Sequence, residues 1–276
     1  MNKTHYIKFL IGLFLLLFVF YYIKPTKEIL SKIVWKYIFL SSLFLIFSYN
    51  FRALGFVFLT KVFKNKKATF KENLEFYKIS LKSMIINEVS IKGSGDIYKF
   101  ALLKKRIGYS NKDSAFLTLS DRILSLFSLI FIVLFILLKD NILGISIAIF
   151  LGLMMLLIFS KIMRNKIYYN KKMIIISFLS NSLGWFFEGI ALYIIFMKNL
   201  VYEVSFPQIY LLLASYIIIG YASLIPSSLG IRELIFVLCS KIYSASQEIY
   251  FIASLILRVA HIIAIIVLSF LIKILH

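Results

Sequence analysis

The strongest constraint on this fold is an apolar run, residues 211–233, that is interrupted by proline and glycine. The interruption is Pro226-Ser227-Ser228-Leu229-Gly230, and Arg232 and Glu233 follow it directly. Such a break frees backbone groups that hydrocarbon cannot hydrogen-bond, so it persists only where protein or water covers it. The charged pair lies where the amides of a new helix point outward, which is typical of an ion or headgroup site in a transporter.

A second interruption has the same form. It contains Gly93 and Gly95, ends at Asp96, and is followed three residues later by Lys99. We expect each break to join two helices that enter the membrane and return to the same side, as a re-entrant hairpin. For the first break a pair of amphipathic surface helices is the alternative, because residues 74–89 carry several charged side chains.

Composition supports a membrane protein. Apolar residues make up 61% of the 276-residue chain, and the mean hydropathy is +0.93, which is typical of a polytopic membrane protein. The net charge is +20. The basic residues lie mainly in loops between apolar runs, as in cytoplasmic loops, and show no nucleic-acid-binding motif. We therefore expect anionic lipid headgroups, and no nucleic acid, as their partners.

Residues of the kinds that hold metals or carry covalent catalysis are few and scattered. Cys239 is the only cysteine, and the three histidines are His5, His261 and His276. This excludes an intramolecular disulfide and a cysteine-based metal site, and it makes a histidine cluster improbable. No Ser-His-Asp pattern, paired-aspartate metal motif or glycine-rich nucleotide loop is present. We predict no metal, no cofactor and no catalytic residue, while leaving open whether the protein is an enzyme.

The apolar runs predict an all-α polytopic membrane protein with about six full transmembrane helices and two re-entrant broken hairpins. The six spans are Phe9–Ile23, Ile33–Leu59, Ile123–Leu138, Ile142–Ser160, Met173–Met197 and Ile249–Ile272. Basic loops indicate the topology, because lysine and arginine are enriched on the cytoplasmic side. The loops at residues 61–71, 99–112 and 161–172 are then cytoplasmic, and so are both termini. We expect a multi-pass protein of the cytoplasmic (inner) membrane.

The spacing of two serines and two arginines predicts an internal repeat. Ser110 to Arg122 and Ser246 to Arg258 both span twelve residues. Twelve helical residues rise about 18 Å, which puts each arginine well inside a hydrocarbon core of about 30 Å. A helix-start signal comes before each arginine: a capping box at Ser110–Asp113, and one that we place at Ser244–Gln247.

The repeat organises the whole chain. We treat residues 1–276 as one transmembrane domain with halves of about 1–138 and 142–276. Each half contains a span, a span, a broken hairpin and a span, and the two halves insert with opposite orientation. An inverted repeat of this kind places the site near the membrane midplane, where the two breaks face each other.

Charged side chains inside the membrane are the candidate functional groups. Each costs about 2.5–3.5 kcal/mol on insertion scales, so it usually has a partner or a function. We predict a cationic cavity in which Lys99, Arg122, Arg232 and Arg258 bind an anionic headgroup; arginine suits phosphate because its planar fork donates two hydrogen bonds at once. The carboxylates Asp96, Glu188 and Glu233 hold the arginines in place or couple transport to protons. The alternative is internal ion pairs that only lock helices together.

At these residues the chain resembles a known family. It is similar to the flippase-like membrane proteins that include the transmembrane region of lysylphosphatidylglycerol synthases. The matching motifs are Asn87, Gly95-Asp96, Lys99 and Asp121-Arg122 in the first half, and Pro226 to Gly230, Glu233 and Arg258 in the second. The first break lacks the family's usual proline, and Lys99 replaces the usual arginine. The resemblance implies lipid translocation without the soluble synthase domain, and nothing supports lysyl transfer.

The function that we predict is movement of an anionic lipid or lipid-linked precursor between leaflets. Two alternatives remain: an integral-membrane lipid-processing transferase, and a non-transporting subunit of a cell-envelope polysaccharide system. Envelope-biosynthesis proteins and a second copy of the chain are further partners that the sequence leaves open. The candidate substrate-binding residues are Asn87, Gly95, Asp96, Lys99, Asp121, Arg122, Glu188, Pro226, Ser227, Ser228, Gly230, Arg232, Glu233 and Arg258.

Overall fold

The computed structural model describes residues 3–31, 33–63, 69–90, 93–164, 170–223, 225 and 228–275. All regular structure in these ranges is helical, and no strand occurs in them. The α-helices are α1 (Lys3–Ile23), α2 (Lys27–Ser31), α3 (Trp35–Phe63), α4 (Phe70–Val89), α5 (Ser94–Leu102), α6 (Asn111–Leu137), α7 (Ile142–Arg164), α8 (Lys171–Ile194), α9 (Phe206–Ser223), α10 (Ile231–Ile242) and α11 (Gln247–Ile274). Two π-helical turns, η1 (Leu103–Ile107) and η2 (Ile195–Asn199), extend α5 and α8.

Six helices in the described ranges are long and apolar enough to cross a membrane: α3, α6, α7, α8 with η2, α9 and α11. The predicted all-α class is therefore confirmed, and the number of helices with the length and composition of membrane spans agrees with the predicted number of about six. Their identity differs in part. The apolar stretch of α1, Phe9–Ile23, is shorter than the other six, whereas α9 has the length and composition of a span. We had assigned α9 to a hairpin because of the break that follows it.

The chain divides into two compact units that do not coincide with its two halves. The first unit contains residues 1–46, 85–95 and 188–276, and the second contains residues 47–84 and 96–187. The boundaries fall inside α3, α4, α5 and α8, so these helices contribute to both units.

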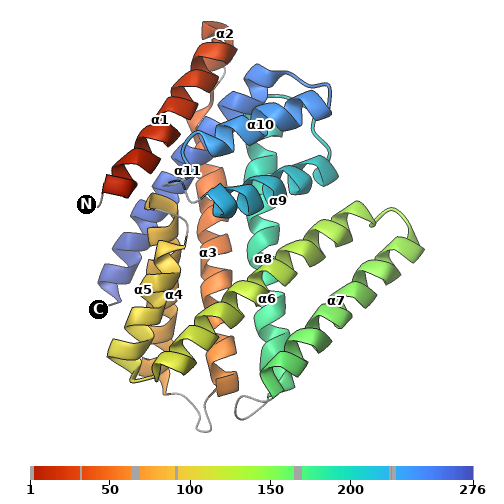
Figure 1. Ribbon diagram of the computed structural model, residues 1–276. Coiled ribbons are helices and arrows are strands. Elements are labelled where there is room, and N and C mark those ends of the chain that lie inside the picture. The colour runs from red at the N-terminus through yellow and green to blue at the C-terminus, as the bar shows by residue number, and fades with distance from the viewer. Residues whose placement is uncertain are drawn as a thin grey trace. The chain divides into compact units, whose positions relative to one another are not determined.

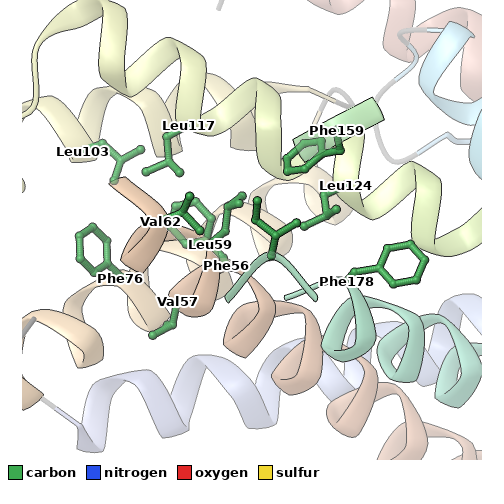
Figure 2. Packing of buried hydrophobic residues seen from close by; sticks show 11 residues of the cluster. Phe56, Val57, Leu59, Val62, Phe76, Leu103, Leu117, Leu124, Phe159 and Phe178 are labelled. Atoms are coloured by element: carbon green, nitrogen blue, oxygen red, sulfur yellow. The ribbon is translucent and has the colours of Figure 1, made fainter. Parts of the chain in front are cut away.

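The second unit is held by an aromatic and aliphatic core, shown in Figure 2. α3 contributes Phe56, Val57, Leu59 and Val62, and the rest of the cluster is Phe76, Leu103, Leu117, Leu124, Phe159, Ile174 and Phe178. Lipid tails are as apolar as these side chains, so close dispersion contact, rather than escape from water, is what favours their association. In the same unit α6 and α7 form an antiparallel hairpin (Figure 1). Its turn lies at residues 139–141, between the predicted spans Ile123–Leu138 and Ile142–Ser160.

The chain doubles back across the first break. Arg106 on η1 forms an ion pair of 2.6 Å with Glu75 near the start of α4, and Phe76 stacks on Tyr109 with 6.2 Å between the ring centroids. The hydrogen bond that Arg106 donates to Glu75 raises the pKa of Arg106, and burial raises the pKa of Tyr109 to about 12. The two ends of this helical hairpin are therefore joined to each other.

In the first unit, α10 packs against α1, α9 and α11 (Figure 1). Gly230 has a φ of +75° and lies directly on α1, where an added Cβ would be 2.5 Å from Leu15 Cβ and 2.6 Å from the carbonyl oxygen of Gly12. An added Cβ on Gly12 would in turn be 2.8 Å from Ile225. α1 therefore covers the second break, and this contact needs glycine on both sides.

The starts of the two long helices that follow the breaks are only partly as predicted. Ser110 caps α6, and its hydroxyl accepts the amide N–H of Asp113 at 3.1 Å. α11 is capped by Ser246, which accepts the amide N–H of Ile249. The capping box that we placed at Ser244 is wrong. Ser244 has a φ of +52° and belongs to the turn after α10, outside the extended conformation that an N-cap residue adopts.

Candidate functional site

The first unit contains a buried ion pair at the second break. α10 begins at Ile231, so Glu233 is its third residue and lies in the first turn, where a carboxylate interacts favourably with the helix dipole. Its side chain is 0% exposed. Arg258 of α11 donates from Nε at 3.1 Å and from Nη2 at 2.7 Å to the same oxygen, Oε1 of Glu233. The other oxygen, Oε2, is buried and accepts no hydrogen bond from the described residues.

A second buried pair lies beside the first. Arg232 of α10 is 2% exposed, and its Nη2 lies 3.4 Å from Oε2 of Glu88 near the end of α4. Its guanidinium also lies over the ring of Tyr216 on α9, 5.1 Å from the centroid. The hydroxyl of Tyr216 donates to Glu188 of α8 at 2.7 Å. A connected set of polar groups thus runs from Glu88 to Glu188 through α4, α10, α9 and α8.

These groups border a cavity of about 210 Å³ in the first unit. Charged or polar side chains form one part of its wall, and apolar ones form the rest. The lining residues are Glu88, Val89, Arg232, Arg258, His261, Ile262 and Ile265, which belong to α4, α10 and α11. The cavity is therefore amphipathic, with two arginines at its polar side.

The second unit has its own pair of ionic contacts after the first break. Lys99 of α5 donates to Asp121 of α6 at 2.5 Å, and its ammonium lies 4.4 Å from the ring centroid of Phe56. Arg122, the next residue of α6, forms an ion pair with Asp96 of α5. Lys99 and Asp121 are buried, with side-chain exposures of 3% and 11%. The predicted residues Asp96, Lys99, Asp121 and Arg122 are thus brought together.

The two arginine pairs have the same construction. Asp96 is the third residue of α5, and Glu233 is the third residue of α10. Arg122 is the twelfth residue of α6, and Arg258 is the twelfth residue of α11. In each case a carboxylate in the first turn of the helix after a break binds an arginine three turns into the next long helix. The spacing that suggested a repeat therefore corresponds to a repeated contact.

Asn87 and Gly95 organise the first break. The side-chain oxygen Oδ1 of Asn87 accepts the amide N–H groups of Gly93 and Gly95, both at 2.9 Å. These amides belong to the start of α5, where the helix itself offers no acceptor. Asn87, on the preceding helix α4, therefore caps α5 and links the two helices across the break.

The remaining predicted residues divide into those that the structure places and those that it does not describe. Pro226 and Ser227 lie outside the described residues. Ser228 is 1% exposed, has a φ of +47°, and packs against Gly220 of α9. Glu188 is buried and bonded to Tyr216. Gly230 contacts α1 rather than lining the cavity.

Three residues that we did not include among the candidates belong to the site: Glu88, Tyr216 and His261. Glu88 lies next to Asn87 in a run whose charge made it a poor membrane span, and that charge was the available signal. His261 lies one turn after Arg258, which was a weaker signal. Tyr216 is one of 17 tyrosines, and nothing in the sequence distinguishes it from the others.

Each of the four cations that we predicted to line a cavity contacts a carboxylate. The pairs are Lys99–Asp121, Arg122–Asp96, Arg232–Glu88 and Arg258–Glu233. Buried charges in pairs are tolerated where single charges are not, and such pairs also fix helices in register. An anion that binds at these cations therefore meets groups that already contact a carboxylate.

Comparison with known proteins adds no assignment. The chain matches no protein-family model and no curated protein sequence. Within the described residues, no group of three or more histidine, cysteine, aspartate or glutamate side chains could hold a metal ion. The interpretation of the site therefore depends on its geometry.

Proposed function

We propose that the protein is a lipid translocase that moves an anionic lipid or lipid-linked precursor between the leaflets of a membrane. The observation that carries this proposal is the repeated contact between a first-turn carboxylate and a deep arginine, Asp96–Arg122 and Glu233–Arg258. Both arginines belong to helices with the length and composition of membrane spans. Charges at that depth are rare and usually mark a substrate or ion pathway.

The cavity beside Arg258 supports the same proposal. Its polar side carries arginine, which suits a phosphate, and its apolar side consists of Val89, Ile262 and Ile265. A lipid has this combination at the junction of headgroup and acyl chains. The substrate class that we propose comprises phospholipids, aminoacylated phospholipids and polyprenyl-phosphate sugars.

The membrane arrangement that we propose is an inverted repeat. α4–α5 and α9–α10 are its two hairpins, each entering and leaving on one side, and they act as gates from opposite sides. The bond between Glu75 and Arg106, which joins the two ends of the first hairpin, supports this arrangement. The basic loops and both termini lie on the cytoplasmic side of the inner membrane. The resemblance to the flippase-like family is consistent with this function.

Lipid movement in reconstituted vesicles tests the function. Purified protein is placed in liposomes that carry a trace of one labelled lipid, and an impermeant quencher reports the label that reaches the outer leaflet. We expect one anionic headgroup to move faster than in empty vesicles. Arg122→Ala and Arg258→Ala should slow it roughly tenfold or more, because a hydrogen bond to a charged group contributes about 1.5–3 kcal/mol.

Arg106→Ala is the matched control. It removes the same charge and also breaks an ion pair, but its side chain is 41% exposed and takes part in neither of the two arginine contacts. We expect it to move lipid at the rate of the unmodified protein. If no headgroup moves, polyprenyl phosphates included, the translocase proposal fails. A new lipid product on chromatography would instead favour a transferase, and a stable complex without activity would favour an envelope-system subunit.

A further inference from the structure

The two ion pairs at the cavity of the first unit carry no net charge. Arg232 and Arg258 carry two positive charges, and their partners Glu88 and Glu233 carry two negative ones. Burial of an additional charge is costly unless a charge of opposite sign accompanies it. An anion that enters this cavity therefore requires one more positive charge, or the neutralisation of one carboxylate.

Arg258 is the group that an entering anion meets. It lines the cavity with 19% of its side chain exposed, whereas its partner Glu233 is fully buried behind it. A phosphate gripped by two parallel N–H groups uses either the Nε–Nη2 edge or the Nη1–Nη2 edge of a guanidinium. Glu233 already accepts from the Nε–Nη2 edge, at 3.1 Å and 2.7 Å. A phosphate that takes this edge displaces Glu233, whereas a phosphate on the Nη1–Nη2 edge adds a second anion beside it.

Glu233 is the group most affected, because it loses the hydrogen bonds that Arg258 donates to it. Its Oε1 accepts both donors of Arg258, and its Oε2 accepts no hydrogen bond from the described residues. A buried carboxylate that loses its donors and gains an anionic neighbour is driven toward its protonated form by both effects. We propose that this cavity binds the phosphate of a lipid headgroup on Arg258 and that Glu233 takes up one proton as it does so.

The step balances in atoms and charge. A proton from the aqueous phase adds to a carboxylate oxygen of Glu233 and gives the neutral acid, while the N–H groups of Arg258 donate their hydrogen bonds to the phosphate instead of to Glu233. When the phosphate leaves, the proton returns to water and the ion pair forms again. For a phosphate diester with a single negative charge, one anion and one proton move together, so the net charge that crosses the membrane is zero.

Other ionisable groups face this pair from every helix around it. They are Arg232 on α10, His261 on α11, Glu88 on α4, Tyr216 on α9 and, bonded to Tyr216, Glu188 on α8. α1 meets α10 through Gly12 and Leu15. His261 is the rival proton acceptor because it also lines the cavity. Glu233 is favoured because it is the direct counter-ion of Arg258.

This inference rests on the proposed function, and the experiment separates the two. Vesicles contain the full chain and a trace of phosphatidylglycerol labelled on an acyl chain, and the fraction of label in each leaflet is measured at steady state. With the interior one pH unit more acidic, proton coupling predicts a tenfold excess of label in the outer leaflet. A membrane potential at equal pH should leave the distribution unchanged, because the paired movement carries no net charge.

Two results would contradict proton coupling. A distribution that follows the membrane potential and ignores the pH gradient overturns the inference while leaving lipid translocation standing. Absence of protein-dependent movement under every condition overturns both. Labelled glycerol phosphate trapped in the vesicles should stay inside; its protein-dependent release would show that the ligand is a soluble phosphate ester rather than a lipid.

Substitutions of Glu233 and His261 test which of the two side chains takes up the proton. Under the pH gradient, Glu233→Gln should bring the leaflet ratio close to one, whereas His261→Gln should keep the tenfold excess at whatever rate it moves lipid. Glu203→Gln, in the exposed loop before α9, is the matched control and should behave like the unmodified protein. The opposite pattern in the first two variants overturns the assignment to Glu233. If Glu233→Gln moves no lipid, the response of the unmodified protein to the two gradients still decides whether a proton is coupled.

Discussion

Replacing the two members of the Glu233–Arg258 pair separately and together should give strongly non-additive losses of stability. Arg258→Met leaves Glu233, which is 0% exposed, without its counter-ion. Breaking a buried pair in this way costs about 3–5 kcal/mol. Glu233→Met should cost less, about 1.5–3 kcal/mol, because Arg258 stays partly exposed at the cavity and loses only hydrogen bonds to a charged group.

The double variant should recover most of this loss. Replacing both members of a buried pair by apolar groups of similar size is often neutral, so we expect a free energy of unfolding within about 1 kcal/mol of the unmodified protein. Titration with sodium dodecyl sulfate in mixed micelles, followed by circular dichroism, measures each value. Additive losses would refute the account of a coupled buried pair. A larger loss for Glu233→Met than for Arg258→Met would refute the assignment of Glu233 as the deeper member.

Three further perturbations test other parts of the structure. Asn87→Leu removes the acceptor of two amides at the first break and should lower the free energy of unfolding by about 1–3 kcal/mol in the same titration. Gly230→Ala adds a methyl group at positive φ against α1 and should cost about 2–5 kcal/mol by that measurement; a neutral effect would contradict the close packing. Topology is tested with a membrane-impermeant thiol reagent, because Cys239, the only native cysteine, is buried. Asp140→Cys should react in intact cells, and Asn170→Cys only after permeabilisation; the reverse pattern would invert the proposed orientation.

Local features of the fold could be predicted because their causes lie within a few residues. The apolar runs identify five of the six helices that have the length and composition of membrane spans, and the turn at residues 139–141 and the cap at Ser110 follow from nearby polar side chains. The other cap could not be placed as well. Ser244 and Ser246 both lie between two helices, and the turn after α10 decides which of them is left in an extended conformation.

The candidate site could be predicted only in part. The two arginines and their first-turn carboxylates stood out because charge is rare in membrane spans, and the structure pairs them at separations of 26 and 25 residues. The Arg232–Glu88 contact joins residues 144 positions apart, so no local pattern indicates it. Tyr216 joins the site through its ring and hydroxyl, and neither is distinguishable in a chain this rich in aromatic residues. Packing of distant helices decides such contacts.

Transport by the Glu233→Met/Arg258→Met double variant is the most direct test of the central claim that these charges act on lipid. The variant is expected to fold with near-native stability, so its activity reports function rather than loss of structure. In the vesicle assay we predict that it moves no more of the anionic lipid than empty vesicles do. Movement at the rate of the unmodified protein would contradict the claim, and would show that the pair only locks α10 to α11.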